Sequence, residues 1–134
     1  MIVAYVSSFS FHFDEIPTDP FGHGGSFVFD CRYVFNPGRL EEYKDLDGLK
    51  KSVEKWLESN PSAQEFWKIV KNLIDFALKQ AREKDMTEIS FHFGCSGGRH
   101  RSVFFAEKSK NYLESLGVRV IIEHIRLKKQ GLLS

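Results

Sequence analysis

The residues with the clearest potential for chemistry form one glycine-rich stretch, Gly94-Cys95-Ser96-Gly97-Gly98-Arg99-His100-Arg101-Ser102. Glycines let the backbone turn tightly and leave its N–H groups uncovered. Arg99, His100 and Arg101 place cationic groups beside those donors, and charge-assisted hydrogen bonds to phosphates and carboxylates are strong. Bare N–H groups next to positive charge predict that this loop binds an anion.

The elements expected on either side of the loop strengthen this prediction. Ile89, Phe91 and Phe93 alternate with polar residues, which indicates a strand, and a helix is expected from about Ser102 to Leu116, closed by a glycine. The start of a helix supplies unpaired N–H donors and the positive end of the helix dipole. Ligands of open α/β sheets bind where strands end and helices begin, so the loop occupies such a position.

The rest of the chain alternates in the same way. Strands are expected over 2–8, 8–13, 26–31 and 118–125. Apolar residues recur at helical spacing over 49–57 and again after Ser62. Ser62 has the spacing of the N-cap residue in a capping box. A short basic tail, 128–131, has little to hold it. Residues 1–134 therefore predict a single three-layer α/β domain with a mostly parallel sheet of four to five strands flanked by helices.

Composition limits the possible functions. The chain has 134 residues, 42% of them apolar, and a formal net charge of only +1, so binding to nucleic acid would require a local basic patch. The first residues lack the basic start and cleavage site of a signal peptide, and there is no apolar run of the roughly 18 residues that span a bilayer. Together with two cysteines, these features favour a cytoplasmic protein with free thiols, without a membrane, metal or cofactor role.

A second chemistry fits the same loop. From Cys95 to Ser102 the residues match the pattern C-x-x-G-x-x-R-S of cysteine-dependent phosphatases, in which a thiolate attacks phosphorus and an arginine, here Arg101, holds the phosphate oxygens. However, Gly94 stands where tyrosine phosphatases usually carry His, and no general-acid loop is evident, although Asp14, Asp19 or Asp30 are candidates. Binding is therefore favoured over catalysis, with phosphatase activity as the alternative.

The sequence also resembles a known family along nearly its whole length, the C-terminal domain of the RNase adapter protein RapZ (YvcJ) family. The family's loop G-C-T-G-G-x-H-R-S-V is similar to 94–103, its S-F-G-F-K to 8–12, its F-D-V-R-F-x-x-N-P to 29–37, and its A-E-x-L to the segment beginning at Ala106. Its T-G-L-D is similar to Asp47-Gly48-Leu49, less closely. The matches keep the family's order and spacing.

The resemblance implies a regulatory function. Members of this family sense an amino-sugar phosphate and present small RNAs to an RNase, and their C-terminal domain holds the ligand pocket and most of the RNA contact. Members also have an N-terminal P-loop domain. This chain contains no G-x-x-x-x-G-K-[ST], so nucleotide binding through such a motif is not carried over to it. Gly38 stands where some members have a histidine that contacts the sugar, and the family's C-terminal H-R pair appears as His124-Ile125 with Arg126 one place later.

These observations predict a domain that binds a phosphorylated small molecule, with RNA and an RNase as possible partners and homo-oligomerisation left open. Asp30 and Arg32 form either a local ion pair or part of the pocket. The residues expected to bind the ligand are Cys95, Ser96, Gly97, Gly98, Arg99, His100, Arg101, Ser102, Asp30, Arg32 and Asn36. Arg126, Lys128 and Lys129 are expected to bind RNA, converging with Arg99 and Arg101 on one basic face.

Overall fold

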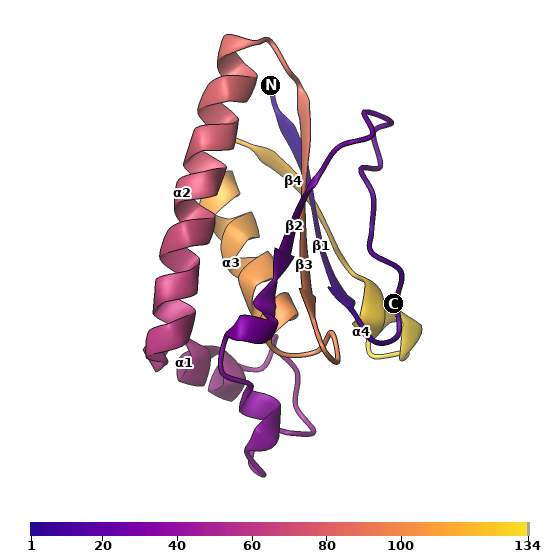
Figure 1. Cartoon of the computed structure of the whole chain (residues 1–134), viewed down its shortest axis with the longest axis vertical. Coiled ribbons are helices and arrows are strands. Elements are labelled where there is room, and N and C mark those ends of the chain that lie inside the picture. The colour runs from indigo at the N-terminus through magenta and orange to yellow at the C-terminus, as the bar shows by residue number, and fades with distance from the viewer. Residues whose placement is uncertain (134) are drawn as a thin grey trace.

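The computed structural model describes residues 1–133 and contains four strands, four α-helices and two short 3-10 helices (Figure 1). The strands are β1 (Val3–Ser10), β2 (Phe27–Asp30), β3 (Glu88–Cys95) and β4 (Arg119–His124). The α-helices are α1 (Lys51–Ser59), α2 (Pro61–Glu83), α3 (Arg101–Ser115) and α4 (Ile125–Lys129). The 3-10 helices are η1 (Cys31–Tyr33) and η2 (Pro37–Arg39).

The strands form one parallel sheet in the order β2-β3-β1-β4, which confirms the predicted α/β class. Val6 lies opposite Phe91, and Phe29 opposite Phe93, so their apolar side chains share one face of the sheet. Because all strands run in the same direction, their carboxyl ends meet at one edge. The segments that follow β1, β2, β3 and β4 are therefore neighbours, although they are far apart in the sequence.

The helices are distributed unequally around the sheet. In Figure 1, α2 and α3 lie on one side, where the buried core collects, while the segment 11–26 runs along the other side and α4 lies at the carboxyl edge. Phe91, Phe93, Phe105, Ile74 and Val6 are fully buried in this core. Within residues 1–133 no helix is long and apolar enough to cross a membrane.

Three local predictions were wrong. The N-cap of α2 is Asn60 and not Ser62, because the Asn60 side chain accepts from the Ala63 N–H (3.1 Å) and Pro61, which lacks an N–H, fits the first helical position. The basic segment 128–131 is also not a loose tail. Its first two residues end α4, whose Leu127 is fully buried and anchors the helix.

The third concerns the expected separate strand over 8–13, whose first residues belong to β1 and whose remainder forms a turn. β1 continues to Ser10, and the chain then folds back, with the N–H of Asp14 donating to the Ser10 carbonyl (2.9 Å). The Ser10 hydroxyl accepts from the N–H groups of His12 and Phe13, both at 3.1 Å. Local side-chain acceptors of this kind compete with strand pairing and end β1 beside the glycine-rich loop.

Candidate anion-binding site

The glycine-rich loop lies where it was predicted, between the end of β3 and the first residue of α3. His100, the N-cap, makes no side-chain capping bond, so the first turn of this 15-residue helix has no side-chain acceptor there. Among the hydrogen bonds within residues 1–133, none uses the backbone N–H of Gly97, Gly98, Arg99 or His100 as a donor. The loop therefore presents unpaired donors at the positive end of a helix dipole.

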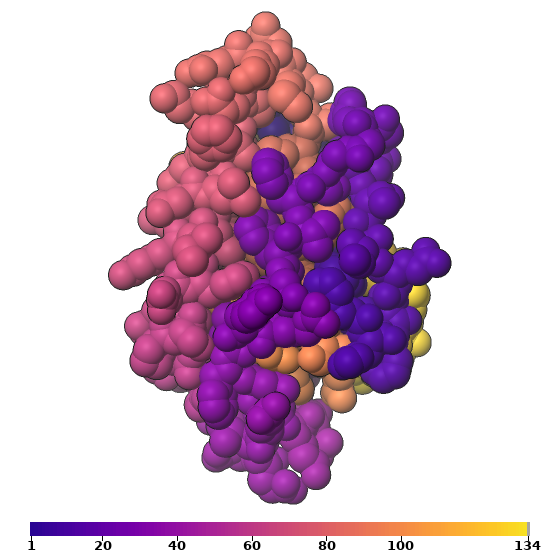
Figure 2. Space-filling view, viewed as in Figure 1, coloured from indigo at the N-terminus to yellow at the C-terminus, as the bar shows by residue number. Residues whose placement is uncertain are grey.

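Gly97 and Gly98 have different roles in shaping the loop. Gly98 has φ +70°, and a Cβ there would lie 2.8 Å from the Ser10 nitrogen and 2.9 Å from the Cβ of Arg126. A Cβ on Gly97 would meet no atom within 4 Å. Gly98 thus lets the loop pack closely against β1 and α4, whereas Gly97 faces open space. In Figure 2 the loop region reaches the surface between the 31–50 segment and the segment that follows β1.

The thiol of Cys95 lies inside the protein. Cys95 is 2% exposed, and its Sγ donates to the Ser102 hydroxyl at 3.1 Å. Cys31 is also buried, and it follows the last residue of β2, Asp30, which pairs with Gly94 in β3. Burial raises the pKa of the Cys31 thiol well above its ordinary value. A nucleophile must reach the phosphorus atom, so this position of Cys95 does not favour the phosphatase chemistry.

Arg101 ties the loop to the segment after β2. Its Nη1 donates to the carbonyl oxygens of Arg32 (3.0 Å) and Val34 (2.9 Å), and the residue is only 5% exposed. Arg101 therefore links the segments that follow β2 and β3, and it also contributes a positive charge.

The residues predicted from the end of β2 gather around Arg101. Arg32, Asn36, Arg39 and Arg101 line a pocket of about 440 Å³, together with Tyr33, Val34, Phe35, Asn60 and Ser62. Asp30 is engaged by Arg32 through two bonds, Nε to Oδ1 (2.9 Å) and Nη2 to Oδ2 (2.7 Å), and the Arg32 side chain lowers the pKa of this carboxyl. Asn36 accepts from the Gly38 N–H (2.9 Å) and so caps η2 while lining the pocket.

The segment 43–48 holds Arg99 and His100 from the other side. His100 Nε2 lies 3.0 Å from the Tyr43 carbonyl, and the Gly48 N–H donates to the Arg99 carbonyl at 2.6 Å. A Cβ on Gly48 would collide with the backbone of the α3 start, so only glycine allows this approach. Burial lowers the pKa of His100, so it is neutral at pH 7 rather than the third cation that the sequence indicated.

The predicted RNA-binding residues separate into two kinds. Arg126 and Lys129 both reach Asp14 Oδ1, at 2.9 and 3.1 Å, and the Asp14 side chain is 1% exposed. Lys128 is exposed. Asp14 was considered only as a possible catalytic acid, and sequence reasoning missed its structural role, because it depends on α4 returning beside β1.

The arginines around the loop share an unusual property. The Nε atoms of Arg99, Arg101 and Arg126 are buried and have no acceptor within the described chain. Native proteins satisfy nearly all buried polar groups, and an orphaned donor calls for an explanation such as an absent ion. Arg99 and Arg101 belong to the loop that carries the unpaired N–H groups, and Arg126 packs against Gly98, which makes this region a candidate site for an oxyanion. No group of three His, Cys, Asp or Glu side chains within residues 1–133 could hold a metal ion.

The fold and this loop define a class of protein, a parallel α/β domain with a glycine- and arginine-rich loop at the carboxyl edge of its sheet. The RapZ C-terminal domain family model matches residues 2–128, and the chain belongs to this family.

Longer relatives carry the same domain. A nucleotide-binding protein of Glaesserella parasuis is 35% identical over 92% of this chain and 41% of its own length. Nucleotide-binding proteins of Thermosipho africanus and Thermosipho melanesiensis are 34% and 38% identical, each over 76% of this chain and 36% of their own length. The chain thus spans about two fifths of these relatives or less, in their C-terminal part.

Proposed function

We propose that this domain binds a phosphorylated small molecule, a sugar phosphate, and acts as a regulatory binding module. The observation that carries the proposal is the set of orphaned donors around the loop, the Nε atoms of Arg99, Arg101 and Arg126. A phosphate group has three oxygens free to accept from such donors and from the N–H groups at the start of α3.

The pocket beside Arg101 supplies a place for the rest of the ligand. It has side-chain donors in Arg32 and Arg39 and amides in Asn36 and Asn60, the kind of groups that bond sugar hydroxyls. Arg101 lines this pocket and also begins α3. A ligand with its phosphate at the loop and its sugar in this pocket would therefore contact Arg101 at both ends.

Calorimetry with glucosamine-6-phosphate and with inorganic phosphate tests the proposal. Replacing Arg101 by alanine removes a charged donor, so the affinity for the sugar phosphate should fall by roughly 1.5–3 kcal/mol. Arg101→Lys keeps the charge but not the two hydrogen bonds to carbonyls, and it tests whether those hydrogen bonds are needed for ligand binding. Arg119→Ala is the matched control, since Arg119 is exposed at the opposite, amino end of the sheet. Unchanged affinity in a folded Arg101→Ala protein would remove Arg101 from the site.

RNA binding is a second candidate, which the same edge of the sheet favours. Tyr33 and Phe35 are 86% and 51% exposed and lie beside Arg32 and Arg39. Phe13, also exposed, has the Arg126 guanidinium 5.4 Å from its ring centre. Exposed aromatic rings interleaved with arginines form stacking platforms for unpaired bases, worth roughly 1–3 kcal/mol per base.

A gel-shift titration of Tyr33→Ala against wild type tests this second candidate with structured RNA that contains single-stranded loops. Loss of a stacking ring should weaken binding without changing its salt dependence, because tyrosine neutralises no phosphate. Tyr5→Ala serves as a control, since Tyr5 lies within β1, away from the carboxyl edge. If wild type gives no shift at low salt and micromolar protein, RNA binding by this domain alone is excluded.

A further inference from the structure

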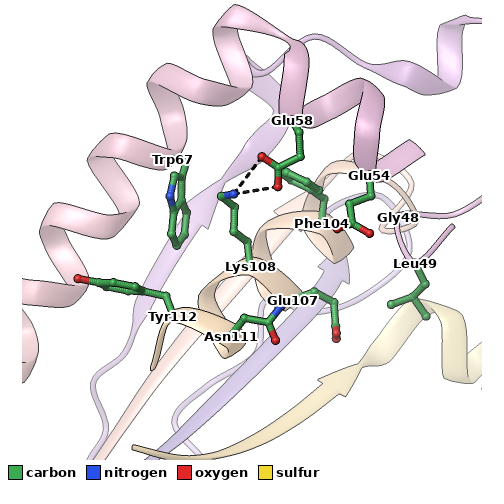
Figure 3. Close-up of a pocket in the computed structure, with 10 residues that line it drawn as sticks. All are labelled: Gly48, Leu49, Glu54, Glu58, Trp67, Phe104, Glu107, Lys108, Asn111 and Tyr112. Atoms are coloured by element: carbon green, nitrogen blue, oxygen red, sulfur yellow. Dashed lines mark hydrogen bonds and ion pairs between the residues drawn. The ribbon is translucent and has the colours of Figure 1, made fainter. Parts of the chain in front are cut away.

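A second pocket of about 440 Å³ lies on the helical side of the domain, away from the arginines of the carboxyl edge. It is formed by α1, α2, α3 and the turn at Gly48 and Leu49, as Figure 3 shows. Three carboxylates, those of Glu54, Glu58 and Glu107, border it together with a single ammonium, that of Lys108. The pocket is therefore negative in a molecule whose overall charge is slightly positive.

Aromatic rings form a second part of the wall, and they already hold an ammonium group. Lys108 Nζ lies 5.2 Å from the ring centre of Trp67 and 5.8 Å from that of Phe104, both within the range of cation–π attraction. The same nitrogen donates to both oxygens of Glu58, at 2.8 and 3.1 Å, and its side chain is only 26% exposed. The Lys108 ammonium thus occupies a site formed by two aromatic rings and a carboxylate.

Helix stability accounts for only part of this acidity, because Glu54 lies in the first turn of α1, where the helix dipole favours a carboxylate. Glu58 lies in the last turn of α1, where the negative end of the helix dipole disfavours a carboxylate. Glu54 makes no side-chain hydrogen bond or ion pair with any of residues 1–133. Glu107 has one oxygen bonded to His124 Nε2, at 2.7 Å, which lowers its pKa and keeps it ionised. Glu54 and Glu107 therefore leave negative charge in the pocket that Lys108 does not match.

We propose that this pocket binds a small aliphatic amine, with its ammonium group at the carboxylates of Glu54 and Glu107 and its carbon chain against Phe104 and Leu49. The position of the Lys108 ammonium shows that the pocket stabilises an ammonium group. The same ammonium limits the affinity for a ligand, because it repels a second ammonium and occupies the space beside the aromatic rings. The pocket is separate from the anion loop, so this site does not depend on the function proposed above.

Fluorescence and calorimetric titration with 1,5-diaminopentane test the proposal on the whole chain. The protein has two tryptophans, so Trp56→Phe leaves Trp67 as the only reporter, in the wall of the pocket. We expect a saturable change in Trp67 fluorescence. Glu54→Gln should weaken binding about two- to fivefold, the range of an exposed ion pair, since Glu54 lies at the surface. Glu54 makes no side-chain hydrogen bond within the described chain, so this variant loses only a favourable interaction with the α1 dipole and should still fold.

Lys108→Met provides the sharper test. This variant should bind the diamine several-fold more tightly, since it removes the ammonium beside the aromatic rings and with it the repelling charge. Lys79→Met removes the same charge from an exposed site of α2 outside the pocket and should change affinity far less. Phosphate binding at the loop should be the same in all these variants. Absence of saturable binding in wild type and in Lys108→Met would overturn the proposal, as would equal effects of the two lysine variants. Binding of a blocked lysine tripeptide without binding of the diamine would also overturn it and indicate a protein partner.

Discussion

Gly97 and Gly98 are neighbours in the loop, but only one of them requires glycine. Gly98 has a positive φ, and its missing side chain lets the backbone approach Ser10. We expect Gly98→Ala to lower the free energy of unfolding by roughly 1–3 kcal/mol, the cost of strained backbone, and to displace the loop from β1. Gly97→Ala is the control and should fold like wild type. Denaturant unfolding measures both, and equal stability of the two variants would contradict this account of the loop.

Cys95 is the residue on which catalysis would depend. Because its thiol is buried and donates to Ser102, we expect negligible hydrolysis of p-nitrophenyl phosphate by the wild-type protein. Cys95→Ser should keep the fold, since serine is similar in size, and should keep phosphate affinity within a few-fold. A spectrophotometric assay decides the matter. Robust turnover that disappears in Cys95→Ser would make this protein a phosphatase and reverse the preference for binding.

At the scale of elements, the sheet depends on a histidine that must stay neutral. His92 in β3 is fully buried, and its Nδ1 lies 2.7 Å from the Ser7 hydroxyl in β1 while its Nε2 lies 3.1 Å from that of Ser26. Burial lowers the pKa of His92 from 6.5 to about 4. The unfolded chain therefore takes up this proton at a higher pH than the folded protein does.

Stability should consequently fall as the pH falls from 6.5 towards 4, because protons favour the unfolded state over this interval. A shift of this size corresponds to at most roughly 3 kcal/mol of stability. Unfolding free energies measured across this range should show a smaller pH slope in His92→Gln, with His12→Gln, an exposed site, as control. An unchanged slope in His92→Gln would mean that other groups carry the acid sensitivity.

At the scale of the whole molecule, the two candidate ligands share one edge of the sheet. The loop donors proposed for a sugar phosphate are also suited to an RNA phosphate, and the exposed rings of Tyr33 and Phe35 adjoin the same pocket. We therefore expect glucosamine-6-phosphate to compete with RNA. Few phosphates are neutralised by such a patch, so the salt dependence should be shallow, about −0.7 per phosphate for a single strand.

Gel shifts at several salt concentrations, with and without glucosamine-6-phosphate, measure this competition. Glucosamine without phosphate is the control, since it lacks the group that the loop is expected to hold. If RNA binds equally well at saturating sugar phosphate, the two sites are independent. That result would separate RNA binding from the loop without affecting the evidence for an anion site.

The sequence by itself determined the α/β class and the position of the glycine-rich loop. Both depend on local patterns, alternation of Ile89, Phe91 and Phe93 in a strand and Gly117 with φ +81° at the end of α3. The sequence also placed Arg99 and Arg101 at the start of this helix, and anion binding by them stays a prediction. The Asn60 cap was missed because two nearby residues, Asn60 and Ser62, both offer capping oxygens, and the proline between them decides which one acts.

Only the tertiary structure decided how the charged side chains are directed. Arg101 turns to the carbonyls of Arg32 and Val34, and Asp14 gathers Arg126 and Lys129, through contacts that join residues 67 to 115 positions apart. His100 is neutral because the 43–48 segment buries it, which no local pattern indicates. The acidic pocket around Lys108 likewise exists only when α1, α2 and α3 pack together. Residue types follow from the chain alone, whereas burial and partners depend on which distant segments the parallel sheet brings to the same edge or face.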